Sequence, residues 1–111
     1  MSLNNQSNRL GDVGRREDAL TAIEEAVKID RGLATARPDA FLPNLAGSLS
    51  NQSNRLGDVG RREDALTAIE EAVKIYGDLG ARHPIYREAH AQSLASKRSL
   101  LTELGDSDGA R

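Results

Sequence analysis

The chain lacks cysteine and tryptophan, and its aromatic side chains are one Phe and two Tyr. Without cysteine it forms neither disulfides nor thiolate metal sites, and it has no cysteine nucleophile. The scarcity of aromatic rings removes the platforms on which proteins stack nucleic-acid bases. The 15 Lys and Arg against 17 Asp and Glu give a formal net charge of −2, whereas proteins that bind phosphate backbones usually carry a basic excess. We therefore expect no nucleic-acid partner.

Long apolar runs are also missing from the sequence. No run approaches the roughly 18 residues that a membrane helix needs, and the first residues show no apolar signal-peptide core. We expect no membrane partner and a cytoplasmic location. The 111 residues leave room for one domain or a short stack of repeats.

A near-perfect internal duplication is the strongest feature of the chain. Residues 48–75 repeat residues 2–29 with one difference in 28 positions, which is Asn4 against Ser50. The period is therefore 46 residues, which is long enough for two helices in each unit. A third, partial unit becomes visible when one residue is deleted after Pro84.

The duplication also sets the expected domain organisation. We expect one repeat array over 1–105 and a disordered tail over 106–111. The units of this array are residues 2–37 and 38–83, followed by the partial unit 84–105. The near-perfect duplication suggests either recent amplification or trimming of a longer array, and we expect the chain to be a fragment of a larger regulatory protein.

Apolar residues recur at spacings of three and four along residues 61–80, which indicates one face of a helix. They are Ala65, Leu66, Ile69, Ala72, Val73, Tyr76 and Leu79. Glycines at positions 14, 60 and 105 are expected to end helices, and Pro38 and Pro84 to begin new ones. These signals predict an all-α fold of about five helices, at 3–13, 16–36, 39–58, 61–80 and 84–104.

Two polar segments, residues 4–8 and 50–54, contain poor helix formers. We nevertheless predict helix there, because Leu49, Leu56 and Val59 keep helical spacing and the repeat supplies a neighbour on each side.

A helix, a short turn after glycine and a second helix with small residues at fixed spacing resemble the tetratricopeptide repeat. The second unit carries this pattern as Leu49, Gln52-Ser53, Leu56, Gly60, Ala65, Ile69 and Ala72. The first unit carries it as Leu3, Gln6-Ser7, Leu10, Gly14, Ala19, Ile23 and Ala26. The resemblance implies antiparallel helix-turn-helix units stacked as a short right-handed solenoid. The 46-residue period is similar to the long, kinesin-light-chain-type repeats of bacterial proteins.

Three residues depart from the family pattern. Gln6, Gln52 and Lys97 occupy a position that is normally apolar in tetratricopeptide repeats. Polar groups at a packed position need hydrogen-bond partners or water. Either the seam between the helices contains an amide network, or that face is wetter than usual, and in both cases we expect lower stability than in a consensus array.

The resemblance implies a concave groove that binds a peptide or a partner protein. By register, its candidate residues are Asn4, Asn5, Asn8, Asp12, Ser50, Asn51, Asn54 and Asp58. Asparagine both donates and accepts hydrogen bonds, so it suits the backbone of an extended peptide. The alternative is that these side chains are inherited by duplication on a solvated face. The family's carboxylate clamp is not expected, because Asn4, Gln92 and Ser96 stand where that clamp has basic residues.

The residues that could carry catalysis or bind metal lack the necessary surroundings. The acids of 15–18 and 61–64 adjoin arginines at a predicted helix start, rather than sharing a cleft that would shift their pKa values. His83 and His90 have no third ligand, and residues 106–109 lack the later ligands of a calcium loop. We therefore predict no enzyme activity, no cofactor and no metal.

A second hypothesis is structural self-assembly. Repeat arrays need polar caps at their ends, and at the N-terminal end Leu10, Leu20 and Ile23 are expected to lack a covering helix. At the other end the candidate self-association residues are Leu94, Leu100, Leu101 and Leu104. Two such faces can cover each other, so we predict a homo-oligomer, at least a dimer.

Overall fold

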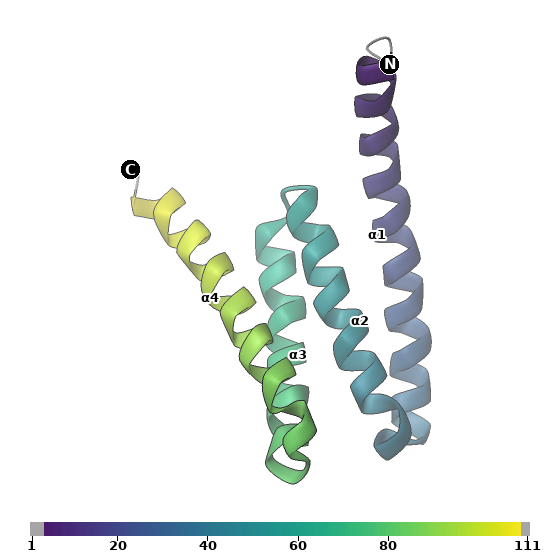
Figure 1. The fold of residues 1–111 in the computed structure, drawn as a ribbon, viewed down its shortest axis with the longest axis vertical. Helices are drawn as coiled ribbons and strands as arrows, with labels where there is room; N and C mark the ends of the chain where they lie inside the picture. Colours follow the sequence, from purple (N-terminus) through teal and green to yellow (C-terminus); the bar gives the residue numbers. More distant parts are fainter. Residues whose placement is uncertain (1–3, 110–111) are drawn as a thin grey trace.

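A computed structural model describes the backbone of residues 4–109 and the side chains of residues 14–105. The described part is all-α, as expected, and contains four antiparallel-packed helices (Figure 1). They are α1 (Asn4–Ala36), α2 (Pro38–Asp58), α3 (Arg62–Arg82) and α4 (Arg87–Gly109), with a 3-10 turn η1 (Pro84–Tyr86) before α4. The shortest extent of the molecule is 22 Å, which corresponds to two layers of helix at about 10–12 Å each.

The first predicted boundary is wrong, because α1 continues through Gly14. The helices expected at 3–13 and 16–36 are therefore one helix. A glycine inside a helix lowers its stability by about 1 kcal/mol relative to alanine, and a helix of 33 residues tolerates this loss. A sharp reversal, in contrast, requires the glycine to adopt a positive φ angle, and Gly14 does not adopt one.

The second unit does reverse at the equivalent glycine. Gly60 has a φ of 84°, and the Arg61 amide donates to the Leu56 carbonyl at 2.9 Å while the Gly60 amide donates to the Gly57 carbonyl at 3.0 Å. This pair of bonds is the Schellman motif, which satisfies carbonyls left free at a helix end. The predicted stop at position 60 is confirmed.

The boundaries of α2 and α3 lie within two residues of the predictions, and Pro38 begins α2 as expected. Pro43 lies inside α2. The helix predicted at 84–104 differs more, because η1 precedes α4 and α4 passes through Gly105 to Gly109. Residues 106–109 of the expected tail are thus helical, and residues 110–111 lie outside the described part.

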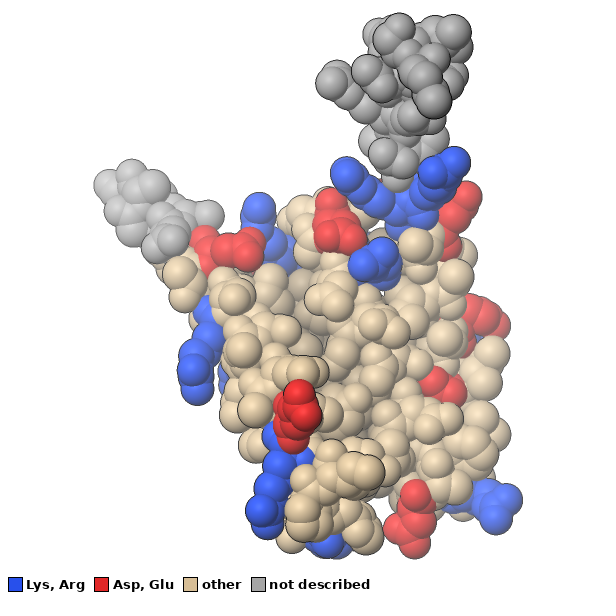
Figure 2. Space-filling model, viewed as in Figure 1, with Lys and Arg blue, Asp and Glu red and all other residues tan. Residues whose placement is uncertain are grey.

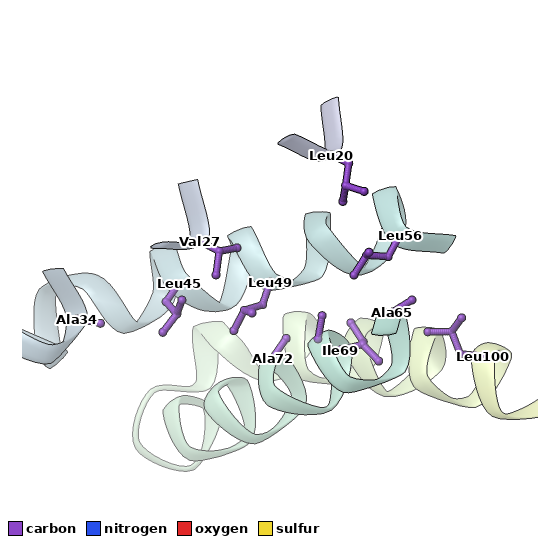
Figure 3. Packing of buried hydrophobic residues seen from close by; sticks show 11 residues of the cluster. Leu20, Val27, Ala34, Leu45, Leu49, Leu56, Ala65, Ile69, Ala72 and Leu100 are labelled. Atoms are coloured by element: carbon purple, nitrogen blue, oxygen red, sulfur yellow. The ribbon is translucent and has the colours of Figure 1, made fainter. Parts of the chain in front are cut away.

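The core lies where α2 meets α1 and α3 (Figure 3). Leu49 of α2 and Ile69 of α3 are the largest fully buried side chains. Ala65 and Ala72 of α3 are 0% exposed, and side chains of this size allow α2 and α3 to approach closely. The buried Ser53 hydroxyl donates to the Ala65 carbonyl at 2.8 Å. The helix pair joined at Gly60 is therefore tightly packed along its length.

Two of the three polar residues that depart from the tetratricopeptide pattern are half-buried in the structure. Gln52 is half-buried, and Lys97 is half-buried with its Nζ 3.7 Å from a Glu70 carboxylate oxygen. The side chain of Gln6 lies outside the described residues. Within the described side chains, every buried nitrogen or oxygen atom has a hydrogen-bond partner.

Candidate binding groove between α2 and α4

A polar groove runs between α2 and α4. It consists of two adjoining hollows of about 370 and 310 Å³, which share Asn54 of α2 and Ser96 of α4 in their walls. Tyr76 of α3 lies in the first hollow, between the two flanking helices. α2 and α4 both pack on α3 (Figure 1), and the two hollows lie between their facing side chains.

The structure brings together the four groove candidates from the second unit. Ser50, Asn51 and Asn54 line the first hollow, and Asp58 lines the second. Their spacing along α2 places them on the helix face toward α4, while Leu49 and Leu56 point into the core. One continuous helix thus presents a polar wall to the groove and an apolar face to α3.

The four candidates from the first unit lie on a different helix from this wall. Asn4, Asn5, Asn8 and Asp12 belong to the N-terminal part of α1, which extends beyond the end of α2 (Figure 1). Their side chains lie outside the described residues. The expectation assumed that this segment forms a separate helix like α2, and the continuous α1 removes that basis.

Sequence reasoning missed the opposite wall and Tyr76. Gln92 and Ser96 of α4 line the groove. From the sequence they were named only because they stand where the family's carboxylate clamp has basic residues. The sequence placed Tyr76 only on the apolar face of residues 61–80. It is half-buried, and burial raises the pKa of its phenol, with a smaller contribution from Tyr86. Its hydroxyl therefore stays protonated and able to donate a hydrogen bond.

The groove is close to neutral. Figure 2, from the same side as Figure 1, shows a mostly uncharged middle with charged side chains toward the margins. The acids at the far end have basic neighbours: Arg55 lies 3.4 Å from Asp58, and Arg62 lies 2.7 Å from Glu103. The groove therefore suits a neutral polar ligand.

The residues considered from the sequence for catalysis or metal binding lie apart from the groove or on the surface. Arg61 donates to Asp64 at 2.7 Å, and both are exposed. His83 is exposed, in edge-on contact with Tyr86 at 6.3 Å between ring centroids. His90 packs against Gly77, where an added Cβ would come within 3.2 Å of its ring. No group of three metal-ligating side chains occurs within the described residues.

The predicted self-association residues divide between two faces of α4. Leu100 is 9% exposed and belongs to the core cluster, and Leu104 lines a hollow with residues 60–64 at the start of α3. Leu101 is 46% exposed and Leu94 is half-buried. Leu94 and Leu101 are therefore available to a partner, whereas Leu100 and Leu104 serve the packing of the chain itself.

At the N-terminal end, Leu20 is 5% exposed because α2 covers it. Ile23 is half-buried and packs against the core cluster. Leu10 lies outside the described side chains.

Searches with protein-family models, against curated proteins and against solved structures gave no match to this chain. Within the described residues, none of the helices has the length and apolar character required to cross a membrane.

Proposed function

We propose that the chain is a protein-protein interaction scaffold that binds an extended peptide in the groove between α2 and α4. The observation that carries this proposal is the groove itself, which is neutral, polar and walled by small side chains such as Ser50 and Ser96. In this proposal the four helices are a short array resembling tetratricopeptide repeats, located in the cytoplasm and belonging to a larger regulatory protein.

The proposed mechanism is hydrogen bonding to a peptide backbone. The Asn51 and Asn54 amides can each donate and accept, so they match the alternating N–H and C=O groups of an extended chain. The protonated Tyr76 hydroxyl adds a donor in the first hollow. Small side chains in the walls let a peptide backbone approach closely. Each net hydrogen bond contributes about 0.5–1.5 kcal/mol, so several together are needed for useful affinity.

A displayed library of random 12-residue peptides tests the proposal, followed by calorimetric titration of the selected peptides. Asn54→Ala should weaken binding by up to about tenfold, which corresponds to one lost hydrogen bond. Ser96→Leu should abolish binding, because it fills the point where the two hollows meet.

The matched control is Asn44→Ala, because Asn44 is an exposed asparagine of α2 and lines neither hollow. It should bind like the unsubstituted chain. Selection of no peptide would contradict the proposal. Binding of the selected peptides by Asn54→Ala and Ser96→Leu as tightly as by the unsubstituted chain would also contradict it.

A second candidate function is structural self-assembly into a homo-oligomer. The observation that favours it is the exposed apolar surface on α1 and on α4. Ile29 of α1 is 54% exposed, and Leu101 of α4 is 46% exposed. Covering such side chains is favourable by about 25 cal/mol for each Å² of apolar surface removed from water. Light scattering during size-exclusion chromatography, over a hundredfold dilution, tests it, and a monomer at every concentration would contradict it.

A further inference from the structure

The duplication reveals an uncovered face on α1. Residues 16–29 of α1 and 62–75 of α3 are identical in sequence, so each of these α1 side chains has an α3 counterpart whose packing the structure shows. Six apolar residues of α1 form what we call the α1 stripe: Ala19, Ala22, Ile23, Ala26, Ile29 and Leu33. Their α3 counterparts, 46 residues later, are Ala65, Ala68, Ile69, Ala72, Ile75 and Leu79.

The two sets differ in burial. Ala22 is exposed and Leu33 is 39% exposed in α1, whereas their counterparts Ala68 and Leu79 are 6% and 5% exposed. In α3 this face is covered by α2, through Leu49 and Leu56 (Figure 3). The surface that fits the α1 stripe is therefore an α2-like helix running antiparallel to α1.

The same chain carries such a helix at its other end. Aligned 45 residues apart, Ala46, Leu49 and Leu56 of α2 correspond to a set in α4 that we call the α4 stripe: Ala91, Leu94 and Leu101. The α2 residues are at most 4% exposed. In the α4 stripe Ala91 is exposed, Leu94 is half-buried and Leu101 is 46% exposed. α4 thus lacks an α3-like partner, just as α1 lacks an α2-like partner.

We propose that the α4 stripe of one copy packs on the α1 stripe of a second copy, reproducing the packing of α2 on α3. This deepens the second candidate function by naming its surfaces. The directions agree, because α1 and α4 flank the molecule and run in opposite senses (Figure 1). In this register Leu94 of one copy takes the place of Leu49, and Ile23 of the next copy takes the place of Ile69, two members of one buried cluster. The contact is heterologous, so it leaves a free stripe at each end and extends as an open series.

Arg98 of α4 adds a charged side chain to the proposed contact between copies, where the contact between α2 and α3 has an uncharged one. It stands at the position of Ser53, whose hydroxyl donates to the Ala65 carbonyl at 2.8 Å. The counterpart of Ala65 is Ala19, and the residue before it is the exposed Asp18. Arginine can lay its aliphatic stem over an apolar surface and keep its guanidinium in water, so Arg98 can cover Ala19 and reach the acid of the next copy. The assembly should accordingly weaken as salt rises.

The test measures the mass of the full chain by light scattering over a hundredfold range of concentration. The unsubstituted chain should give a mass that grows with concentration. Ile29→Glu removes the α1 stripe, Leu101→Glu removes the α4 stripe, and each variant alone should be monomeric. Mixed in equal amounts, the two variants should form a 1:1 dimer that grows no further, because one intact stripe of each kind remains. Ile85→Glu is the control, since Ile85 is 82% exposed in η1 and lies outside both stripes.

The contrary outcomes are distinct. A chain that is monomeric throughout overturns both this pairing and the self-assembly function. An oligomer that survives Ile29→Glu and Leu101→Glu overturns the pairing and leaves self-assembly standing. Two variants that stay monomeric when mixed also overturn the pairing. If either variant loses its helical circular dichroism, Ala22→Glu or Ala91→Glu replaces it, because both alanines are exposed.

Discussion

Gly14 and Gly60 occupy the same place in the two units, with identical residues on both sides. Gly60 adopts a φ of 84° and ends α2, whereas Gly14 lies in the continuous α1. At both positions an added Cβ would meet nothing within 4 Å. The difference between the two sites is therefore conformational rather than steric.

The same substitution should have opposite effects at the two glycines. Gly60→Ala should lower the free energy of unfolding by about 1–2 kcal/mol, because an L-residue pays that cost in the left-handed region. Gly14→Ala should raise it by about 0.5–1 kcal/mol, because alanine favours a helix interior over glycine. Urea unfolding followed by circular dichroism measures both. Destabilisation by Gly14→Ala would mean that the first unit also reverses at its glycine in solution.

The ion pair between Arg31 of α1 and Glu71 of α3 makes a pH-dependent contribution to the stability of the fold. Two hydrogen bonds join the side chains, at 2.6 and 3.0 Å. The hydrogen bond from Arg31 is the main cause that lowers the pKa of Glu71 below its ordinary value of 4.5. A carboxyl whose pKa is lower in the folded state stabilises the fold above its unfolded pKa and loses that contribution as pH falls through the folded pKa.

Glu71→Gln should therefore destabilise the chain at pH 7 and have a diminishing effect below about pH 4.5. The side chains are 50% and 38% exposed, so solvent screening keeps the effect within roughly 0.2–1 kcal/mol. Glu25→Gln is the control, because exposed Glu25 is the counterpart of Glu71 in the first unit. Thermal unfolding at pH 7 and pH 3 measures the difference. An equal effect of Glu71→Gln at both pH values would contradict the assignment.

At the scale of the helices, the sequence predicted α2 and α3 well because several local signals coincide there. Pro38 begins α2, the Schellman glycine at 60 ends it, and the period of α3 is regular. The continuity of α1 through Gly14 could not be predicted, because the local sequence at Gly14 is the same as at Gly60. What differs is the context: α2 follows α1 and packs on it, while the segment before Gly14 has no earlier helix in the described part.

Equivalent leucines in α2 and α4 should differ in their contribution to stability. Leu49→Ala should cost about 2–5 kcal/mol, because it leaves a cavity at a site that is 2% exposed. Leu94→Ala should cost roughly 1 kcal/mol, since Leu94 is half-buried. Urea unfolding at a concentration where the chain is monomeric compares them. Equal losses would contradict the burial difference between the two helices.

At the scale of the whole molecule, only part of the candidate site followed from the sequence. The α2 wall was predicted because the resemblance to tetratricopeptide repeats assigned Ser50, Asn51, Asn54 and Asp58 by register to one face of a single helix. The α4 wall and Tyr76 depend on how α4 crosses α3, which is a tertiary property. The groove lies between α2 and α4, whereas Ala19, Ala22 and Ile23 of the α1 stripe border a separate hollow with Asn51 and Arg55 of α2.

Pairing of the α1 and α4 stripes predicts a melting temperature that depends on protein concentration. A partner that binds the folded chain but not the unfolded chain stabilises it by about 2.7 kcal/mol when its concentration is 100 times the dissociation constant. One kcal/mol shifts the Tm of a small domain by about 4–8 °C, so Tm should rise by several degrees between dilute and concentrated samples. Leu101→Glu should have a Tm that is independent of concentration and close to that of the dilute unsubstituted chain, because Leu101 is 46% exposed. Ile85→Glu should retain the concentration dependence, and its loss there would show that the rise does not come from the stripes.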